Sequence, residues 1–189
     1  MSDKIYQIKI SLLDIKPLIW RRVAVSGNVT LAKLHKIIQT VMGWENYHLH
    51  EFRYKGVVYA VPDPEFDNVD VVDDRKAKLS RMIKEPKQQF SYTYDFGDGW
   101  GHRLLVEKIS DPEPEITYPI CMGGERACPP EDCGGTYGYE NFLEAIGDLG
   151  HEEHETMLEW IGGEFDANEF SVEETNEILA DEFKSKSVK

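Results

Sequence analysis

Three cysteines in the second half of the chain have side chains that can bind a metal ion. Cys121, Cys128 and Cys133 follow one another at spacings of seven and five residues, in a segment rich in Gly and Pro. Structural zinc sites use four Cys or His ligands and usually contain two cysteines that are two to four residues apart. Four residues separate Cys128 from Cys133, so a zinc ion is one hypothesis, with His102 or His48 as the fourth ligand. The alternative is that the thiols are small buried side chains that pack this segment.

Histidines and aspartates form a second candidate set. His48 and His50 alternate along a predicted strand, so both side chains lie on the same face. With Asp95, Asp98 and His102 they would make a nitrogen and oxygen site for a metal ion, provided that the two predicted hairpins are adjacent. The alternative is a polar network that supports tight turns. The sequence leaves both interpretations open.

The two aspartates lie in a predicted β-hairpin over residues 89–109, whose first strand alternates along its length. The connection at residues 96–101 reads Phe-Gly-Asp-Gly-Trp-Gly, and its three glycines permit backbone angles that other residues avoid. An Asp-Gly pair is enough for a hairpin turn, so the additional carboxylate, Trp and His predict a binding surface. With residues from other segments included, the candidate binding residues are Trp20, Arg22, Tyr94, Asp95, Asp98, Trp100, Glu131 and Asp132.

The elements that must position these residues begin with a hairpin. Alternating residues at 5–13 and 20–25 predict its two strands. Apolar residues at the helical period then predict a helix over 31–42, bounded by an N-cap Thr and a stop Gly. Strands are expected within 48–61, and residues 62–88 are predicted to be a long polar loop with one short helix near residues 79–83.

The second half of the chain is patterned more weakly. Residues 118–139 contain too many Gly and Pro residues for a helix or a central strand, so we predict an ordered functional loop. The two glycines at 134–135 could form a nest that binds an anion before the next helix. Short helices are predicted at 139–147 and 151–161, and a capping box predicts a last helix at 171–183.

These elements predict one α+β domain over residues 1–189. Residues 1–110 would form a sheet-rich core, residues 111–183 a Gly/Pro-rich loop and an acidic helical part, and residues 184–189 a frayed tail. The sheet is expected to be mixed, mostly antiparallel and to begin β-β-α-β. That opening is compatible with a ubiquitin-like, or β-grasp-like, core with C-terminal helices packed on or beside it.

Charge is distributed unevenly along the chain. Residues 1–110 contain 17 basic and 14 acidic side chains, a net charge of +3, whereas residues 111–189 contain 4 and 21, a net charge of −17. The acidic part would repel nucleic acid, which makes a nucleic-acid partner unfavourable. An odd number of cysteines does not indicate a secreted disulfide framework, and no apolar run approaches the ~18 residues of a membrane span. The N-terminus has no signal-peptide pattern, so we expect a cytoplasmic protein without membrane contact.

Six motifs spread over about residues 5–180 are specific in combination. They are Ile19-Trp20-Arg21-Arg22, Leu34-His35 with Met42-Gly43-Trp44, His48-Leu49-His50-Glu51-Phe52, the stretch from Tyr94 to His102, the stretch from Cys128 to Gly135, and Trp160-Ile161-Gly162-Gly163-Glu164-Phe165-Asp166. Together they resemble the plasmid pRiA4b ORF-3-like family. The resemblance implies little about activity, because that family is uncharacterised and some members are merely labelled transposon resolvases. We find neither the serine-nucleophile region nor the helix-turn-helix tail that this label would require.

The chain supports three function hypotheses. The favoured one is a non-enzymatic binding or adaptor module for a protein partner, with a surface made of the 95–102 turn and the 121–139 loop. It is favoured because aromatic and Gly residues are concentrated there without a recognisable catalytic set. The sequence contains no phosphate-binding loop, dinucleotide motif or nucleophile elbow. The second is a metal-binding protein or metal-dependent enzyme that uses the His, Asp and Cys residues, with zinc as the candidate cofactor. The third is a mobile-element-associated nucleic-acid accessory protein that would act through Arg21, Arg22 and the basic run 75–84.

Overall fold

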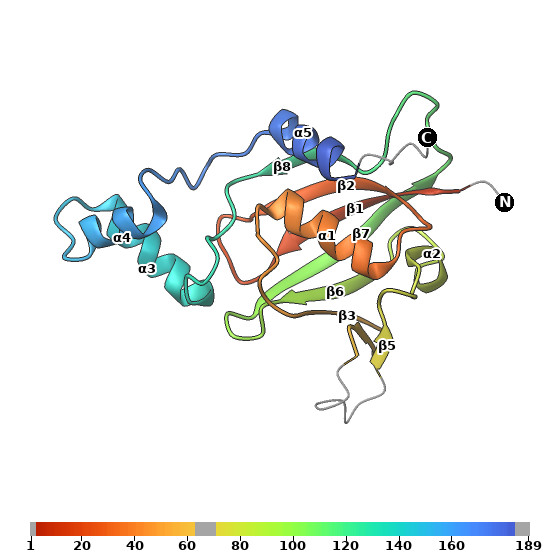
Figure 1. Ribbon diagram of the computed structural model, residues 1–189, viewed down its shortest axis with the longest axis horizontal. Helices are drawn as coiled ribbons and strands as arrows, with labels where there is room; N and C mark the ends of the chain where they lie inside the picture. Colours follow the sequence, from red (N-terminus) through yellow and green to blue (C-terminus); the bar gives the residue numbers. More distant parts are fainter. Residues whose placement is uncertain (1–2, 63–70, 184–189) are drawn as a thin grey trace.

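An eight-stranded sheet forms the centre of the structure, a computed structural model that describes residues 3–62 and 71–183 (Figure 1). Its strands are β1 (Ile5–Leu12), β2 (Trp20–Ser26), β3 (His50–Tyr54), β4 (Val57–Ala60), β5 (Val71–Asp73), β6 (Gln89–Tyr94), β7 (Trp100–Ser110) and β8 (Ile120–Glu125). They lie in the order β5-β4-β3-β6-β7-β1-β2-β8. Neighbouring strands are antiparallel, except that β5 runs parallel to β4. The predicted mixed, mostly antiparallel sheet is therefore confirmed.

The predicted β-β-α-β opening is also confirmed, because helix α1 (Leu31–Met42) follows β2 and precedes β3. Together with the C-terminal helices, this makes the protein an α+β protein. The finer expectation of a β-grasp-like core is not confirmed. Strand β1 lies between β2 and β7, and both pairings are antiparallel.

Helix α1 lies across one face of the sheet (Figure 1). Its predicted ends are confirmed: the Thr30 hydroxyl oxygen accepts a hydrogen bond from the Lys33 amide at 3.2 Å, and Gly43 ends the helix with a φ of 87°. Leu34, Ile37 and Ile38 are fully buried against the sheet. Each such side chain contributes about 1.5–3 kcal/mol of hydrophobic free energy, so this face carries the core of the domain.

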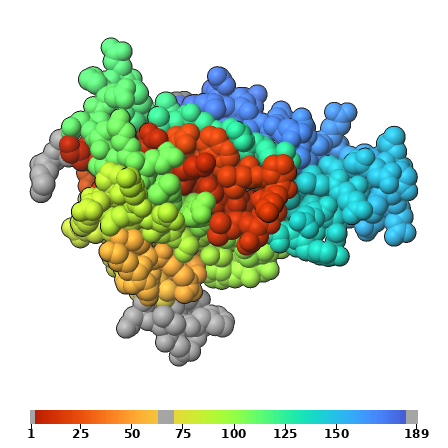
Figure 2. Space-filling view, turned by 180° about the vertical axis from the view of Figure 1, so that it is seen from behind, coloured from red at the N-terminus to blue at the C-terminus, as the bar shows by residue number. Residues whose placement is uncertain are grey.

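The opposite face of the sheet carries polar side chains, and no helix from residues 3–62 and 71–183 covers it. Seen from behind, the N-terminal hairpin lies at the molecular surface and α1 is out of view (Figure 2). Arg22 forms a two-pronged ion pair with Glu107, with N···O distances of 2.6 and 3.0 Å, and Lys9 lies 4.6 Å above the Trp20 ring. Arg22, a predicted binding residue, is therefore paired with a carboxylate of the same sheet face.

The predicted loop at 62–88 is only partly described, because residues 63–70 lie outside the described residues. The remainder contains β5 and a short helix α2 (Leu79–Met82), close to the predicted one. Within this segment Arg75 forms an ion pair with Asp73, at 2.8 Å. An exposed pair of this kind contributes only about 0–1 kcal/mol.

Three helices complete the fold: α3 (Gly135–Gly147), α4 (His154–Ile161) and α5 (Val172–Glu182). Helices α3 and α4 project from the end of the sheet in both views, whereas α5 returns to lie beside β8 (Figures 1 and 2). We call residues 135–161 the α3–α4 lobe. The predicted cap of α5 is confirmed, because the Ser171 hydroxyl accepts a hydrogen bond from the Glu174 amide at 3.2 Å. The predicted tail at 184–189 lies outside the described residues.

The segment 118–139 differs from the predicted loop, because it contains β8 at the edge of the sheet. Two glycines occur within this strand, and at Gly124 the neighbouring side chains leave no room for a Cβ atom. A Cβ atom at Gly124 would lie 2.5 Å from the Phe170 ring and 2.8 Å from Cδ of Arg21. The glycine therefore marks close packing rather than a turn. In the described part of the chain, no helix is both long and apolar enough to cross a membrane.

Candidate functional site

Two segments far apart in sequence meet at the end of the β6–β7 hairpin. The turn at residues 95–99 contacts the segment that leads into α3. A carboxylate oxygen of Asp98 accepts a hydrogen bond from the Gly134 amide at 3.1 Å. A Cβ atom at Gly135 would lie only 2.6 Å from the Asp98 carbonyl oxygen. An amide of the predicted glycine nest thus does bind an anion, and that anion is a carboxylate of the same chain.

A third segment, the loop after α1, is fixed to the other two by Trp44 and Tyr94. The Trp44 indole N–H donates a hydrogen bond to the Pro129 carbonyl oxygen at 2.9 Å, and its ring stacks on Tyr94 with centroids 5.0 Å apart. The Tyr94 hydroxyl donates to Glu131 Oε1 at 2.9 Å. Burial, and then the neighbouring Glu131 carboxylate, raise the pKa of Tyr94. This tyrosine therefore stays protonated and acts as a donor to Glu131.

His48 lies where these three segments converge. Its Nε2 atom is 2.8 Å from Asp132 Oδ1, 3.6 Å from Asp95 Oδ2 and 4.0 Å from Glu131 Oε2. The ligand atoms of His48, Asp95 and Asp132 all lie within 4.8 Å of one another. We call these three residues the His48 cluster. Two of its members, Asp95 and Asp132, have left-handed backbone conformations with φ of 53° and 56°.

Two polar atoms at the His48 cluster are buried without a hydrogen-bond partner among the described residues. They are Nε2 of His48 and Oε2 of Glu131. The 2.8 Å contact between His48 and Asp132 has the distance of an ion pair but not the angles of a hydrogen bond. Ligand atoms about 3–4 Å apart have the spacing needed around an ion with bonds of about 2.0–2.2 Å. Imidazole with carboxylates is a ligand set that suits zinc and other divalent transition metals.

His50 and His102, the other two histidines of the predicted metal set, lie elsewhere. His50 Nε2 is 2.8 Å from the buried Asp74 carboxylate. His102 is fully buried in the core, and its Nδ1 lies 3.0 Å from the Trp100 carbonyl oxygen. Burial lowers the pKa of His102 to about 4, so the ring is neutral near pH 7. Both imidazoles thus serve the polar packing of the interior.

His35 belongs to the same interior network, and the sequence reading did not identify it. Its ring stacks on that of His50 with centroids 3.5 Å apart. Its two nitrogens lie 2.8 Å from the Tyr92 hydroxyl and 2.6 Å from Asn46 Oδ1. Burial, and then the adjacent His50, lower the pKa of His35 to about 3. The position of His35 beside the apolar stripe of α1 was the available signal.

The three cysteines are not brought together as ligands of one ion. In the part of the chain that the structure describes, the group of His, Cys, Asp and Glu residues close enough to share an ion is the His48 cluster. Cys121 Sγ lies 3.7 Å from the Gly123 carbonyl oxygen, and Cys128 Sγ lies 3.6 Å from Met42 Sδ. Burial raises the pKa of Cys128 to about 11 and of Cys133 to about 12. These thiols are neutral packing groups, which is the alternative given above.

The remaining candidate binding residues are divided between the core and the open face. Trp100 is 1% exposed and packs near Trp44 in the core. Trp20 and Arg22 point to the open face of the sheet, away from α1. Arg21, between them, points the other way and is buried. The structure therefore assembles Tyr94, Asp95, Asp98, Glu131 and Asp132 with His48, and it separates Trp20, Arg22 and Trp100 from them.

Arg21 has an unusual environment for a buried charge. Its guanidinium donates hydrogen bonds to the carbonyl oxygens of Val41, Trp20, Glu125 and Arg126 at 2.7–3.0 Å. Its plane lies 3.8 Å from the centroid of Phe170. Burial lowers the pKa of Arg21. This arginine fixes α1, β2 and the end of β8 to one another and is not free to contact nucleic acid.

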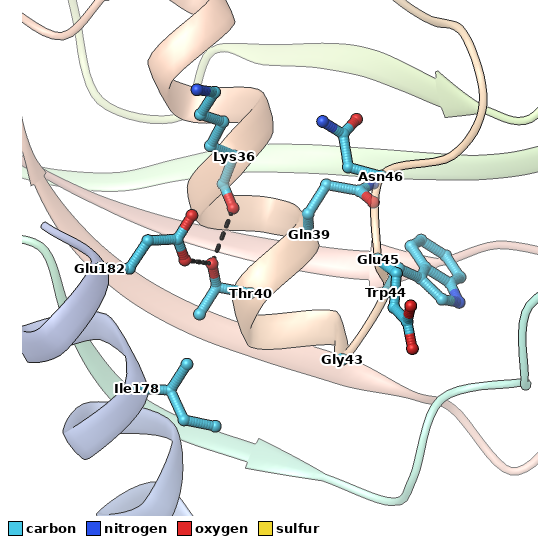
Figure 3. A pocket seen from close by; sticks show the side chains of 9 residues that line it. All are labelled: Lys36, Gln39, Thr40, Gly43, Trp44, Glu45, Asn46, Ile178 and Glu182. Atoms are coloured by element: carbon cyan, nitrogen blue, oxygen red, sulfur yellow. Dashed lines mark hydrogen bonds between the residues drawn. The ribbon is translucent and has the colours of Figure 1, made fainter.

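A surface hollow lies beside the His48 cluster, between α1, α5 and the loop at 43–46 (Figure 3). It has a volume of about 440 Å³ and contains charges of both signs, from Lys36 and Glu182. The Thr40 hydroxyl bonds to the Glu182 carboxylate and lies 3.0 Å from the Lys36 carbonyl oxygen. These contacts join α5 to α1, and the described residues that line the hollow include no group of metal ligands.

The fold and the site together define a class of small α+β proteins with one candidate metal centre made of an imidazole and carboxylates. The chain belongs to the plasmid pRiA4b ORF-3-like family, whose model matches residues 4–174. It is 35% identical over 182 residues to the uncharacterised protein y4hQ of Sinorhizobium fredii (strain NBRC 101917 / NGR234), covering 96% of this chain and 93% of that protein. It is also similar to a crystal structure of MM3350, a protein of unknown function from Methanosarcina mazei Go1. The TM-score is 0.82 at 40% identity, and the match covers 92% of this chain and 98% of that one. Neither relative's name states an activity.

Proposed function

We propose that this protein is a non-enzymatic binding module that holds a divalent metal ion through His48, Asp95 and Asp132, with Glu131 as a further ligand. The observation that carries the proposal is the buried Nε2 atom of His48. It faces three carboxylates at 2.8–4.0 Å and makes no hydrogen bond within the described part of the chain. A divalent cation between these groups would satisfy the imidazole and neutralise carboxylates that otherwise repel one another.

The ion would have a structural consequence, because its ligands come from three separate segments. His48 follows α1, Asp95 begins the β6–β7 turn, and Asp132 precedes α3. Asp132 is the most exposed ligand, with 64% of its side chain accessible, so the ion would face solvent on that side. Zinc is the first candidate, since one imidazole with carboxylates suits it. A metal ion held by these residues would supply a positive charge at this point of the surface.

Direct metal binding tests this proposal. The full chain, stripped with chelator and dialysed, should bind one equivalent of Zn²⁺ in isothermal titration. An ion at about 100 times its Kd should stabilise the fold by about 2.7 kcal/mol. His48→Gln and Asp95→Asn should each weaken binding by about 10–100-fold. Asp111→Asn, which removes the same charge far from the cluster, is the matched control. Absence of stoichiometric binding for Zn²⁺, Mn²⁺, Co²⁺ and Ni²⁺, with the same melting temperature in chelator and in metal, would exclude the proposal.

A protein-binding role for the surface formed by the 95–102 turn and the 121–139 loop is the second candidate. It is supported by the aromatic side chains exposed there, since Phe96 is 55% and Tyr137 is 74% accessible. Exposed aromatic residues near each other are typical of interaction sites. Trp100, in contrast, is a core residue, so Trp100→Ala would disturb folding and cannot test this role. The informative variant is Phe96→Ser with Tyr137→Ser, compared with Leu149→Ser, in affinity measurements with any purified partner. Equal affinities of both variants would exclude this surface.

A further inference from the structure

The α3–α4 lobe and the segments around it are acidic to an unusual degree. From Ala127 to Phe183 the sequence contains 17 carboxylates and no Lys or Arg. In the ion pairs formed among the described residues, no carboxylate of the α3–α4 lobe takes part. Such a surface repels itself, and it attracts cations over distances of about 10 Å at ordinary ionic strength. The charge is therefore complementary to a basic partner.

A groove with an apolar floor runs through this acidic surface. It has a volume of about 450 Å³ and lies between the segment at 132–133 and helices α3 and α4. Its floor is made of Phe142, Met157 and Trp160, and its polar rim of Asp132, Asn141, Glu153 and Thr156. Trp160 is 47% exposed and meets Phe142 edge to face, with ring centroids 5.6 Å apart. An aromatic ring of this size, held half in solvent beside carboxylates, is more than the packing of two short helices requires.

Glu153 is the rim carboxylate with the clearest freedom to bind a cation. It occupies the N-cap position of α4, yet its side chain makes no capping hydrogen bond. It lines the groove together with Asp132 and Trp160, so an occupant would meet two carboxylates and an indole ring. An ammonium or guanidinium group over a Trp face gains about 0.5–2 kcal/mol, and its aliphatic stem packs well on Phe and Met side chains.

We infer that this groove binds a Lys or Arg side chain from a basic segment of a protein partner. Its volume lies within the range of about 300–1,000 Å³ that is usual for ligand sites. The acidic surface continues beyond the groove along both helices, so further cationic side chains of the same segment would also find complementary charge. The inference deepens the protein-binding role given above as the second candidate, on which it rests, by naming the class of partner. It requires neither the metal ion nor His48.

The test uses the full chain and a fluorescein-labelled peptide of alternating Gly with Arg and Lys, followed by fluorescence anisotropy. A peptide with Glu in place of Arg and Lys is the negative probe. Trp160→Ala should weaken binding of the basic peptide by about tenfold, through loss of the cation–π contact. Glu153→Gln should weaken it by about threefold. Glu177→Gln removes the same charge from exposed helix α5, and it should leave the affinity within about twofold.

The possible outcomes separate the groove from general attraction and from the metal site. Equal losses in Glu153→Gln and Glu177→Gln, with no effect of Trp160→Ala, would show unspecific charge attraction and overturn the inference. Free arginine that binds as tightly as the peptide would overturn the assignment to a protein segment. Asp95→Asn removes a proposed metal ligand that does not line the groove, so peptide affinity should persist in that variant and in chelator. Failure of the metal proposal and failure of the groove are thus recognised independently.

Discussion

The α3–α4 lobe differs in composition from the sheet and the helix α1 that covers it. Beneath α1, large side chains such as Tyr92, Phe52 and Trp100 are almost fully buried, and the Tyr92 hydroxyl is hydrogen-bonded to the side chains of His35 and Gln39. In the lobe, Trp160 and Leu149 are exposed and the surface is uniformly acidic. The first region is specified by packing, which stabilises the fold. The second carries apolar and charged groups that add little to stability, which indicates selection for contact with something else.

Two tryptophans give the largest expected contrast. Trp100→Ala should destabilise the protein by about 3–5 kcal/mol, because it leaves a cavity in the core. Trp160→Ala should change the unfolding free energy by about 1 kcal/mol or less, because its ring is half in solvent. Urea unfolding followed by circular dichroism measures both. Similar losses in the two variants would mean that the lobe is part of the packed core, and the contrast would disappear.

Two adjacent arginines test the same contrast between interior and surface. Arg21→Ala should destabilise the fold by about 3 kcal/mol, since several buried carbonyl oxygens lose their donor. Arg22→Ala breaks a partly exposed pair with Glu107 and should lose about 1 kcal/mol or less. The same urea experiment compares them, with thermal unfolding as a second measurement. A larger effect at Arg22 would show that the open face contributes more stability than its exposure indicates.

The stability of the folded protein should also depend on pH above pH 5, through the buried histidines rather than through surface carboxylates. The His102 ring is neutral in the folded state down to pH about 4, whereas the unfolded chain binds a proton at its ordinary pKa of 6.5. Between these values the unfolded state binds more protons, so stability falls as the pH falls. The loss is about 1.4 kcal/mol per pH unit, or about 2 kcal/mol between pH 6.5 and 5. His35, with its pKa lowered to about 3, adds to the loss in the same direction.

Urea midpoints at pH 6.5 and 5 measure this dependence. His102→Phe should make the slope shallower by about one proton, and the difference should persist in 0.5 M KCl, which screens the acidic surface to within about 4 Å. An unchanged slope in the variant would show that another group causes the dependence.

The junction between the two regions should be sensitive to a single methyl group. Gly135→Ala places a Cβ against the Asp98 carbonyl oxygen at a φ of +69°, so we expect a loss of about 1–2 kcal/mol. Gly147→Ala, at the other end of α3, has open space around it and should be neutral or slightly stabilising. Hydrogen exchange of the α3 amides would show whether the loss is local to that helix. Equal stabilities of the two variants would contradict a tight junction.

Local patterns predicted the elements whose signals are local. The α1 caps, the β6–β7 hairpin and the start of α5 depend on residues a few positions apart, and all were recognised. Strand β8 was missed, because Gly123 and Gly124 resemble turn residues when Trp20, Arg21 and Phe170, which fill the space beside them, are unknown. The burial of Arg21 likewise depends on carbonyl oxygens from four positions along the chain, which no spacing rule reveals.

The sequence identified the residues of the candidate site, but it also included residues that lie elsewhere. His48, Asp95, Asp132 and Glu131 were all named from residue type, and the structure places them together. His50 lies two residues after His48, and His102 lies at the end of the same hairpin motif as Asp95. His50 nevertheless faces Asp74, and His102 is buried in the core. The difference arises because strand pleating determines the face of the sheet on which a side chain lies, but not the residues that contact it there. The cysteines were interpreted either as ligands or as packing groups, because their spacing does not distinguish bound thiolates from buried thiols, and the structure does not bring the three together.

The bond between Asp98 and Gly134 has a practical consequence for protein engineering. Hairpin tips are ordinarily the first places chosen for an inserted tag or reporter, because their length is free to vary. Here the β6–β7 tip is hydrogen-bonded to a chain segment 36 residues away. An added residue in the tip would therefore displace the start of α3. The α3–α4 connection at Leu149, whose side chain is almost entirely in solvent, is the better insertion point.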